Sequence, residues 1–287
     1  MKITAVKART LIMVCLLAWS CVLQAEATPH SGSSFPGHGI SASIDVGVEY
    51  FRWQEFDARG RRLLTEQGPR YVLETLLGNN RGSQDGILYG ILVRGYAGDV
   101  DYDGQDSNGV FTSSDTTYRG WGAELQGGYR FSVTATFSLD ALLAAGVDDW
   151  RREIDNSINA NGGAVGGFAE DYTVYYGRIG MGALWSASWA DHYLQGGAKR
   201  PWSISEDPGA LNIRLSPGEE WSAYVSYEMR FRHTGPGRPF VRFYYDTYRF
   251  SKSSSERVSL APPFTSGFVN QPETDFDVLG VMLGYAF

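Results

Sequence analysis

The residues whose types and spacing come closest to a chemical site are the acidic residues of segment 99–109. Asp99, Asp101 and Asp103 occupy alternate positions there. Carboxylates at this spacing resemble the ligands of a hard cation, because Ca²⁺ takes about six to eight oxygen ligands. An EF-hand is excluded, because the twelfth residue counted from Asp99 is Val110, where that loop requires a bidentate Glu. The sequence therefore predicts either a calcium site at these three residues or a solvated acidic loop, with no other cofactor.

The elements that must position this segment are strands, because the clearest periodicity in the chain has a period of two. At the C-terminus, Leu279, Val281, Leu283, Tyr285 and Phe287 alternate with mostly smaller residues. Nine earlier segments have the same period: 40–53, 69–77, 87–97, 118–131, 135–150, 171–185, 192–202, 219–232 and 239–250. After the first 27 residues, no apolar run approaches the roughly 20 residues that a membrane-spanning helix needs. Alternating strands cross a membrane without such a run when they close into a barrel.

The connections between these segments alternate in length. Three are short, at 132–134, 186–191 and 234–238, and they alternate with long polar segments at 100–117, 151–170, 203–218 and 251–274. Short periplasmic turns and longer extracellular loops are typical of outer-membrane barrels. The sequence thus predicts an all-β protein, a transmembrane antiparallel up-and-down β-barrel of about ten strands. Segments 54–68 and 78–86 are ambiguous, which leaves eight or twelve strands open.

The same alternation assigns charged residues of both signs to the lumen. These residues are Asp45, Glu49, Glu74, Arg94, Glu124, Arg130, Asp140, Asp148, Arg178, Lys199, Glu228, Arg230, Arg242 and Asp246. Because buried charges must be paired, they predict a salt-bridged interior and disfavour an open pore. A small channel is kept as an alternative.

The N-terminal residues predict export. Lys2, Lys7 and Arg9 precede an apolar run, and Ala25-Glu26-Ala27 offers small residues to a signal peptidase, so 1–27 is predicted to be a cleaved signal. Residues 28–39 form a periplasmic tail and 40–287 the barrel. Both cysteines lie in the signal, which excludes disulfides unless Cys21 is instead a lipidated N-terminus. A net charge of −7 and a pI of about 5.2 argue against nucleic-acid binding.

A family resemblance offers a second interpretation of the acidic segment. Asp101-Tyr102-Asp103, followed by Asp106-Ser107, is similar to the Asp-x-Asp pair and Asp-Ser of the omptins, ten-stranded outer-membrane proteases. Softer matches lie at 145–151 and 194–197. The resemblance implies that Asp101 and Asp103 replace the first acidic pair of the family, which acts with an Asp–His pair to activate water. Asp207-Pro208-Gly209 matches the residues that follow that His, but the His is missing.

The four histidines do not replace it. His30 and His38 lie in the predicted tail, and His192 and His233 border turns predicted to be periplasmic. The extracellular mouth therefore has no imidazole to act as a base near neutral pH.

The leading hypothesis is a non-catalytic outer-membrane barrel of a Gram-negative bacterium. Its acidic loops would bind a surface partner, a glycan or a cation. The alternative is a surface protease or lipid hydrolase that uses Asp101, Asp103 and other mouth carboxylates such as Glu206 and Asp207. Expected partners of the monomer are outer-membrane lipid, lipopolysaccharide near Arg119 or Arg151, and the barrel-assembly machinery, which would recognise the terminal Phe287.

Overall fold

The structure is a computed structural model, and it describes residues 39–80, 84–106, 108–209, 211, 213–232, 237–258 and 267–287. The predicted signal, the tail up to His38 and the lipidation alternative at Cys21 lie outside these residues, as do His30 and His233. Among the described residues there is no helix that could span a membrane.

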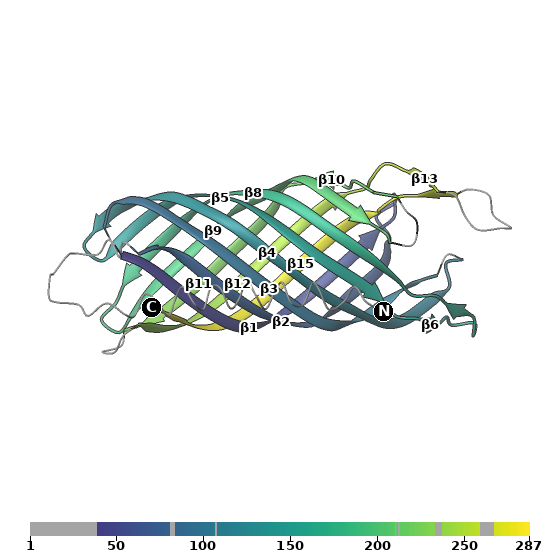
Figure 1. The fold of residues 1–287 in the computed structure, drawn as a ribbon, viewed down its shortest axis with the longest axis horizontal. Coiled ribbons are helices and arrows are strands. Elements are labelled where there is room, and N and C mark those ends of the chain that lie inside the picture. The colour runs from purple at the N-terminus through teal and green to yellow at the C-terminus, as the bar shows by residue number, and fades with distance from the viewer. Residues whose placement is uncertain are drawn as a thin grey trace. The chain divides into compact units, whose positions relative to one another are not determined.

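Ten long antiparallel strands close into a barrel (Figure 1). They are β1 (Gly39–Phe56), β2 (Arg62–Asn80), β3 (Gly86–Gln105), β4 (Phe111–Thr134), β5 (Phe137–Ile154), β8 (Phe168–Ser186), β9 (Ala190–Asp207), β11 (Ser222–Phe231), β12 (Arg238–Ser251) and β15 (Glu273–Ala286). Consecutive members of this series pair, and β15 returns to pair with β1, which closes the ring. The short elements are β6 (Ser157–Ile158), β7 (Ala164–Val165), β10 (Gly218–Glu219), β13 (Glu256–Val258) and β14 (Gly267–Val269). The prediction of an up-and-down barrel is confirmed, with ten strands in the ring.

The two ends of the barrel differ in their connections. The terminal end holds Gly39, Phe287 and the short turns that follow β4 and β8 (Figure 1). The opposite end, called the loop end here, holds the β1–β2 and β3–β4 turns and the hairpins β6–β7 and β13–β14. Successive connections along the chain thus alternate between the terminal end and the loop end, as in an up-and-down barrel.

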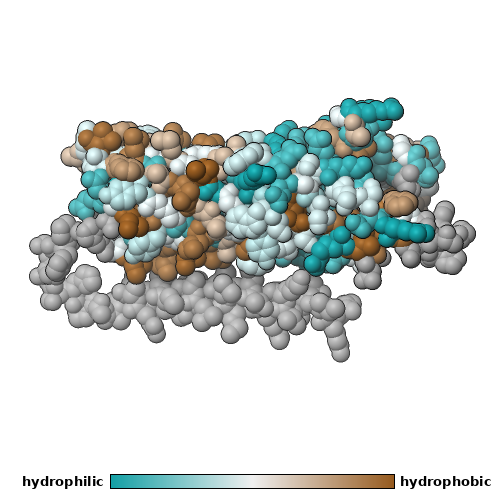
Figure 2. Space-filling view, turned by 90° about the horizontal axis from the view of Figure 1, so that it is seen from above, coloured by the Kyte–Doolittle hydropathy of each residue, from teal (hydrophilic) through white to brown (hydrophobic). Residues whose placement is uncertain are grey.

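On the face that Figure 2 shows, apolar side chains gather toward the terminal end, and exposed apolar residues on strands around the ring form an apolar band there. Its outward side chains include Ile44, Val46, Leu125, Leu143, Ile179 and Leu283, all of which are exposed. Of the described residues, the band comprises those of 40–50, 70–97, 120–148, 175–202, 221–246 and 278–287, and the loop end those of 51–69, 98–119, 149–174, 203–220 and 247–277. A closed backbone with an apolar exterior meets both requirements for crossing lipid.

Several segments that the sequence analysis interprets as loops are strand. β3 continues to Gln105 and β4 begins at Phe111, so only a tight turn remains of the predicted loop 100–117. The ambiguous segment 54–68 likewise forms the ends of β1 and β2 and the turn between them.

The strands extend because their alternation continues with its polarity reversed. In the apolar band, β3 points Ile87 and Ile91 outward, whereas at the loop end it points Val100 and Tyr102 inward and acids outward. Where a strand leaves the lipid and enters water, its outward residues become polar. A strand predicted from its outward apolar residues therefore ends several residues before the real strand does.

The lumen in the apolar band is filled by ion pairs, as predicted. The two carboxylate oxygens of Glu49 accept from Arg70 and Arg94, with Arg94 Nη2 at 2.8 Å, and Tyr244 donates to the same carboxylate at 2.6 Å. Arg242 reaches Asp45 at 2.6 Å and also pairs with Glu74. These contacts cross the barrel interior and leave water-sized space, with a cavity of about 70 Å³ among them.

Candidate functional site

The loop end encloses a cluster of four glutamates around one arginine, called the Glu–Arg152 cluster here. Arg152 Nη1 lies 2.7 Å from Glu170 Oε2 and 3.3 Å from Glu55 Oε1, and Arg152 Nη2 lies 2.8 Å from Glu66 Oε1. The fourth member is Glu206 on β9, which is 1% exposed. Arg152, which is itself 1% exposed, pairs with Glu55, Glu66 and Glu170, so three buried carboxylates share a single guanidinium beside Glu206.

Neutral donors form hydrogen bonds with three of these glutamates, and the first is Glu170, which accepts from the Tyr172 hydroxyl at 3.0 Å. Glu66 accepts from Tyr118 and from Thr116, whose Oγ1 lies 3.1 Å from Glu66 Oε1. Glu55 accepts from the Trp53 indole at 2.9 Å and from the Gln271 amide at 3.2 Å. Such charge-assisted bonds hold carboxylates in one orientation without adding positive charge. The negative charge of the cluster therefore remains undercompensated.

Glu206 carries the clearest sign of this excess. Burial, and then the nearby carboxylates of Glu170 and Glu55, raises the pKa of Glu206 to about 9. Its Oε2 atom is buried and has no hydrogen-bond partner. Burial also raises the pKa of Glu170, against the opposing effect of Arg152. Near neutral pH, Glu206 is therefore a neutral carboxylic acid, which lowers the charge that must be buried.

Aromatic rings form a floor beneath the cluster. Trp53 packs edge-on against Tyr172 with ring centroids 5.3 Å apart, and Trp150 stacks on Tyr172 at 5.1 Å. Phe250 of β12 and Phe276 of β15 continue the floor, Phe276 as the register partner of Trp53, and both are buried. Large rings that meet across the lumen exclude water, which strengthens the electrostatic interactions above them.

The strand register explains why the cluster forms. Trp150, Arg152 and Ile154 are alternate residues of β5, and all three point inward. Glu170 and Tyr172 do the same on β8, where Tyr172 pairs with Glu206 of β9. The sequence predicts Glu206 as a mouth carboxylate, whereas Arg152 and Glu170 fall within the predicted loop 151–170. Continuing the period of two past Trp150 would have found them.

The acidic residues singled out from the sequence lie outside this cluster. Asp99, Asp101 and Asp103 are exposed on the outward side of β3, and Asp99 accepts from Thr117 at 2.7 Å. Alternate residues of a strand are about 7 Å apart, so their carboxylates do not converge. No group of three or more His, Cys, Asp or Glu suited to a metal ion occurs among the described residues. Calcium binding and catalysis by these residues stay predictions that their placement does not favour.

Other residues named from the sequence are separated in the same way. Asp207 is exposed on the outward side of β9, next to buried Glu206. Asp106 closes the β3–β4 turn, where hydrogen bonds from Val110 N–H and Asn159 lower its pKa. Arg119 and Arg151 are outward and paired, Arg119 with Glu153 at 3.2 Å and Arg151 with Asp171 at 3.0 Å.

His192 is the one histidine that the structure describes, and it lies near the terminal end. It follows the β8–β9 turn, stacks on Trp185 at 5.1 Å and contacts the Tyr227 hydroxyl through Nδ1 at 2.7 Å. It is therefore at the opposite end of the barrel from the Glu–Arg152 cluster.

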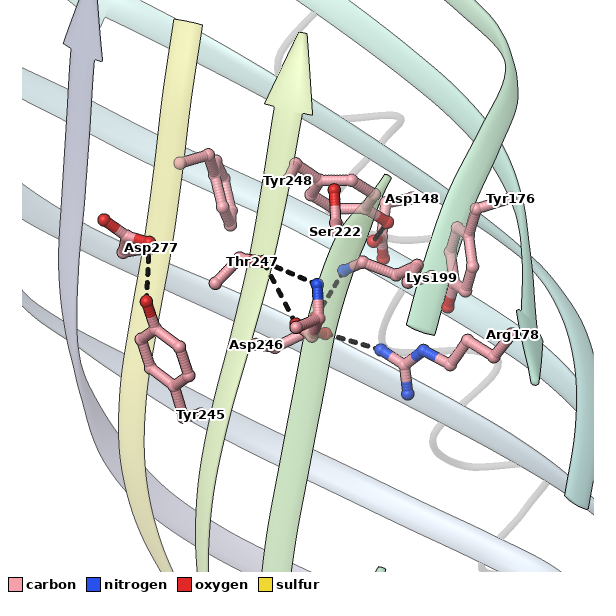
Figure 3. Close-up of polar contacts among 12 residues, drawn as sticks. Asp148, Tyr176, Arg178, Lys199, Ser222, Tyr245, Asp246, Thr247, Tyr248 and Asp277 are labelled. Atoms are coloured by element: carbon pink, nitrogen blue, oxygen red, sulfur yellow. Dashed lines mark hydrogen bonds and ion pairs between the residues drawn. The ribbon is translucent and has the colours of Figure 1, made fainter. Parts of the chain in front are cut away.

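A second polar group lies deeper, inside the apolar band. Figure 3 shows Asp246 of β12 between Lys199 and Arg178, each 2.5 Å away. Tyr248 donates to Asp148 beside them, and the Lys199 ammonium lies 3.4 Å from the Tyr248 ring centroid. Each charge has a close partner, which is the arrangement of a structural plug.

Comparison with solved structures agrees with this architecture. The outer-membrane protease OmpT from Escherichia coli matches with a TM-score of 0.55 at 10% identity, over 89% of this chain and 98% of that chain. The fold is that of an outer-membrane β-barrel. The translocator domain of the autotransporter NalP from Neisseria meningitidis also matches, with a TM-score of 0.42 at 9% identity, over 98% of this chain and 97% of that chain. Protein-family models and curated proteins gave no match. The OmpT likeness concerns the barrel and carries no site residue across.

Proposed function

We propose that this outer-membrane barrel is a non-conducting, non-catalytic protein whose loop end binds a cationic partner at the cell surface. The observation that carries the proposal is the charge distribution. The loop end holds 21 of the 32 acidic residues of the chain and 11 of its 25 Lys and Arg, a formal charge of −10. Among the described residues, the apolar band is balanced, with 10 acidic and 10 basic residues. A surface of one sign attracts ligands of the other and accelerates their association.

Binding of a short cationic peptide tests the proposal. Tetralysine is expected to bind the refolded full chain in neutral detergent and to weaken as NaCl is raised, because exposed charges are screened over about 8 Å at physiological ionic strength. Tetraglutamate is the matched control and should not bind. Absence of tetralysine binding at low salt, or binding that salt leaves unchanged, would contradict the proposal.

The filled interior supports the non-conducting part of the proposal. Ion pairs occupy the lumen of the apolar band, and the aromatic floor covers them toward the loop end. We therefore expect the protein to be electrically silent in a planar bilayer to which an open porin gives steady current. Reproducible single-channel steps from the purified protein would favour the channel hypothesis instead.

The hydrolase hypothesis receives less support from the described residues. Asp101 and Asp103 point away from the lumen, and Glu206 is buried without access to a substrate. The hydrolase hypothesis would be supported if the purified protein hydrolysed peptides or lipids and the Asp101→Ala, Asp103→Ala double substitution abolished that activity.

The outward-facing residues of the barrel support proposals for three further partners: the barrel-assembly machinery, membrane lipid and lipopolysaccharide. Outward Leu279, Val281 and Leu283 with exposed Phe287 fit recognition by a barrel-assembly machinery, and the apolar band fits lipid. Lipopolysaccharide contact stays a proposal, because Arg119 and Arg151 are already paired with carboxylates. A closed sheet has no free edge to pair with another copy, which fits a monomer.

A further inference from the structure

A pocket of about 370 Å³ opens at the loop end beside the Glu–Arg152 cluster. Tyr102 and Ile154 point into it from β3 and β5, and both are buried. Phe168 and the hairpin β6–β7 form another side. The volume lies in the range of pockets that hold small molecules, about 300–1,000 Å³.

The walls of the pocket are fastened to each other by specific bonds. Asn159, in the β6–β7 turn, donates to Asp106 at 2.8 Å, and the Thr112 and Ser157 hydroxyls lie 2.7 Å apart. The backbone N–H of Ala160 donates to the Phe111 carbonyl at 2.9 Å. The hairpin is therefore held against the β3–β4 turn, and the pocket does not depend on a loose segment.

The charged side chains that line the pocket are all acidic. Two carboxylates, Asp106 and Asp155, line the pocket, and its lining includes no Lys or Arg. The buried Ser114 hydroxyl oxygen, also in the lining, has no hydrogen-bond partner. Acceptors without a matching cation are suited to a ligand that brings positive charge and N–H donors.

The neighbouring cluster adds to this field. Ile154 of the pocket and Arg152 of the cluster are alternate inward residues of β5, so the two sites adjoin. Together they contain six carboxyl groups: Glu55, Glu66 and Glu170 pair with Arg152, Glu206 is neutral, and Asp106 and Asp155 line the pocket, which leaves an excess of negative charge. In a partly water-excluded mouth such an excess attracts a cation more strongly than the same charges spread on the surface.

We propose that this pocket, between the β3–β4 turn and the β6–β7 hairpin, binds an organic amine through Asp155, Asp106 and Ser114. The inference rests on the proposed function and assigns it a site and a ligand class. An organic cation fits better than a metal ion, because the described residues contain no metal-binding group of three or more such ligands. Tyr102 and Phe168 add aromatic surface, which packs against the methylene groups of an amine and attracts its charge.

The test uses spermidine as the probe and titration calorimetry of the refolded full chain in detergent at about physiological salt. Asp155→Asn removes one carboxylate from the pocket and is expected to weaken binding about tenfold or more, because a hydrogen bond to a charged group is lost. Asp101→Asn is the matched control. It removes the same charge from the outward side of β3, and we expect less than about a twofold change because salt screens it.

The outcomes separate this inference from the proposed function. Equal weakening by both substitutions would show diffuse binding, which overturns the pocket and leaves the proposed function intact. If neither spermidine nor tetralysine binds, both the pocket inference and the proposed function are overturned. Magnesium binding that competes with spermidine and is lost with Asp155→Asn would assign the pocket to a metal ion and overturn the ligand class.

Discussion

At the residue scale, the two adjacent arginines of β5 have opposite roles. Arg152 is buried among three carboxylates, whereas the Arg151 side chain is 38% exposed and pairs with Asp171 at 3.0 Å. Only the strand alternation separates them. Removing a guanidinium from buried carboxylates leaves charges uncompensated, whereas an exposed pair is worth little.

We therefore expect Arg152→Met to destabilise the barrel by about 3–5 kcal/mol and Arg151→Met by about 0–1 kcal/mol. Equilibrium unfolding in urea, in detergent or lipid, measures both. Equal effects of the two substitutions would show that the Glu–Arg152 cluster is not the buried network described above.

Glu206 should make stability depend on pH. Its pKa is raised from 4.5 to about 9, so between these values the folded state binds more protons than the unfolded state. Stability should therefore fall as pH rises from about 5 to 9, by at most about 1.4 kcal/mol per pH unit for this group, and level off above it.

Glu206→Gln, which keeps a neutral side chain of the same size, should flatten this dependence in urea unfolding at pH 5, 7 and 9. Asp207→Asn, at the exposed neighbour on the same strand, should leave the slope unchanged. A fall with pH that is as steep or steeper in Glu206→Gln than in the unmodified protein would refute the assignment.

At the scale of elements, the Asn159 side chain makes three of the bonds that shape and attach the β6–β7 hairpin. Asn159 accepts from the backbone N–H groups of Asn161 and Gly163 and donates to Asp106, so it both shapes the turn and attaches it to β3–β4. Local units with few such contacts open independently of the rest of a protein.

Asn159→Ala should therefore release the hairpin without unfolding the barrel. In hydrogen exchange, protection of residues 157–165 should fall while that of β4 and β5 in the apolar band stays unchanged. Asn161→Ala is the control, because the Asn161 contact uses its backbone N–H alone. Unchanged protection at 157–165 in Asn159→Ala would mean that other contacts hold the hairpin.

At the scale of the whole molecule, the acidic loop end and the apolar band define an orientation in the membrane. Both cysteines lie within residues 1–27, so single introduced cysteines report on topology once the predicted signal is removed. Asp103 is exposed at the loop end, and Ser188 is exposed in the turn between β8 and β9 at the terminal end.

Asp103→Cys should react with a membrane-impermeant maleimide on intact cells, and Ser188→Cys should react only after the outer membrane is opened. The reverse labelling pattern would show that the barrel has the opposite orientation, with the acidic loop end facing the periplasm.

Much of this architecture follows from local pattern. The alternation of Leu279, Val281 and Leu283 with smaller residues predicts the last strand, and tight turns such as 132–134 predict hairpins. The prediction ended early on β3 and β5 because polarity reverses where those strands leave the apolar band. Asp101, which looked like a loop ligand, is for that reason an outward strand residue.

By itself, the sequence determined the barrel, its ten strands within the range it left open and the side on which each charge of the apolar band lies. These properties depend on neighbours one or two residues away along the chain. Only the tertiary structure decided which charges meet. The partners of Arg152 are 97, 86 and 18 residues away, at Glu55, Glu66 and Glu170. They come together because closing the sheet brings β1, β2, β5 and β8 around one lumen, where a charge without a partner is costly.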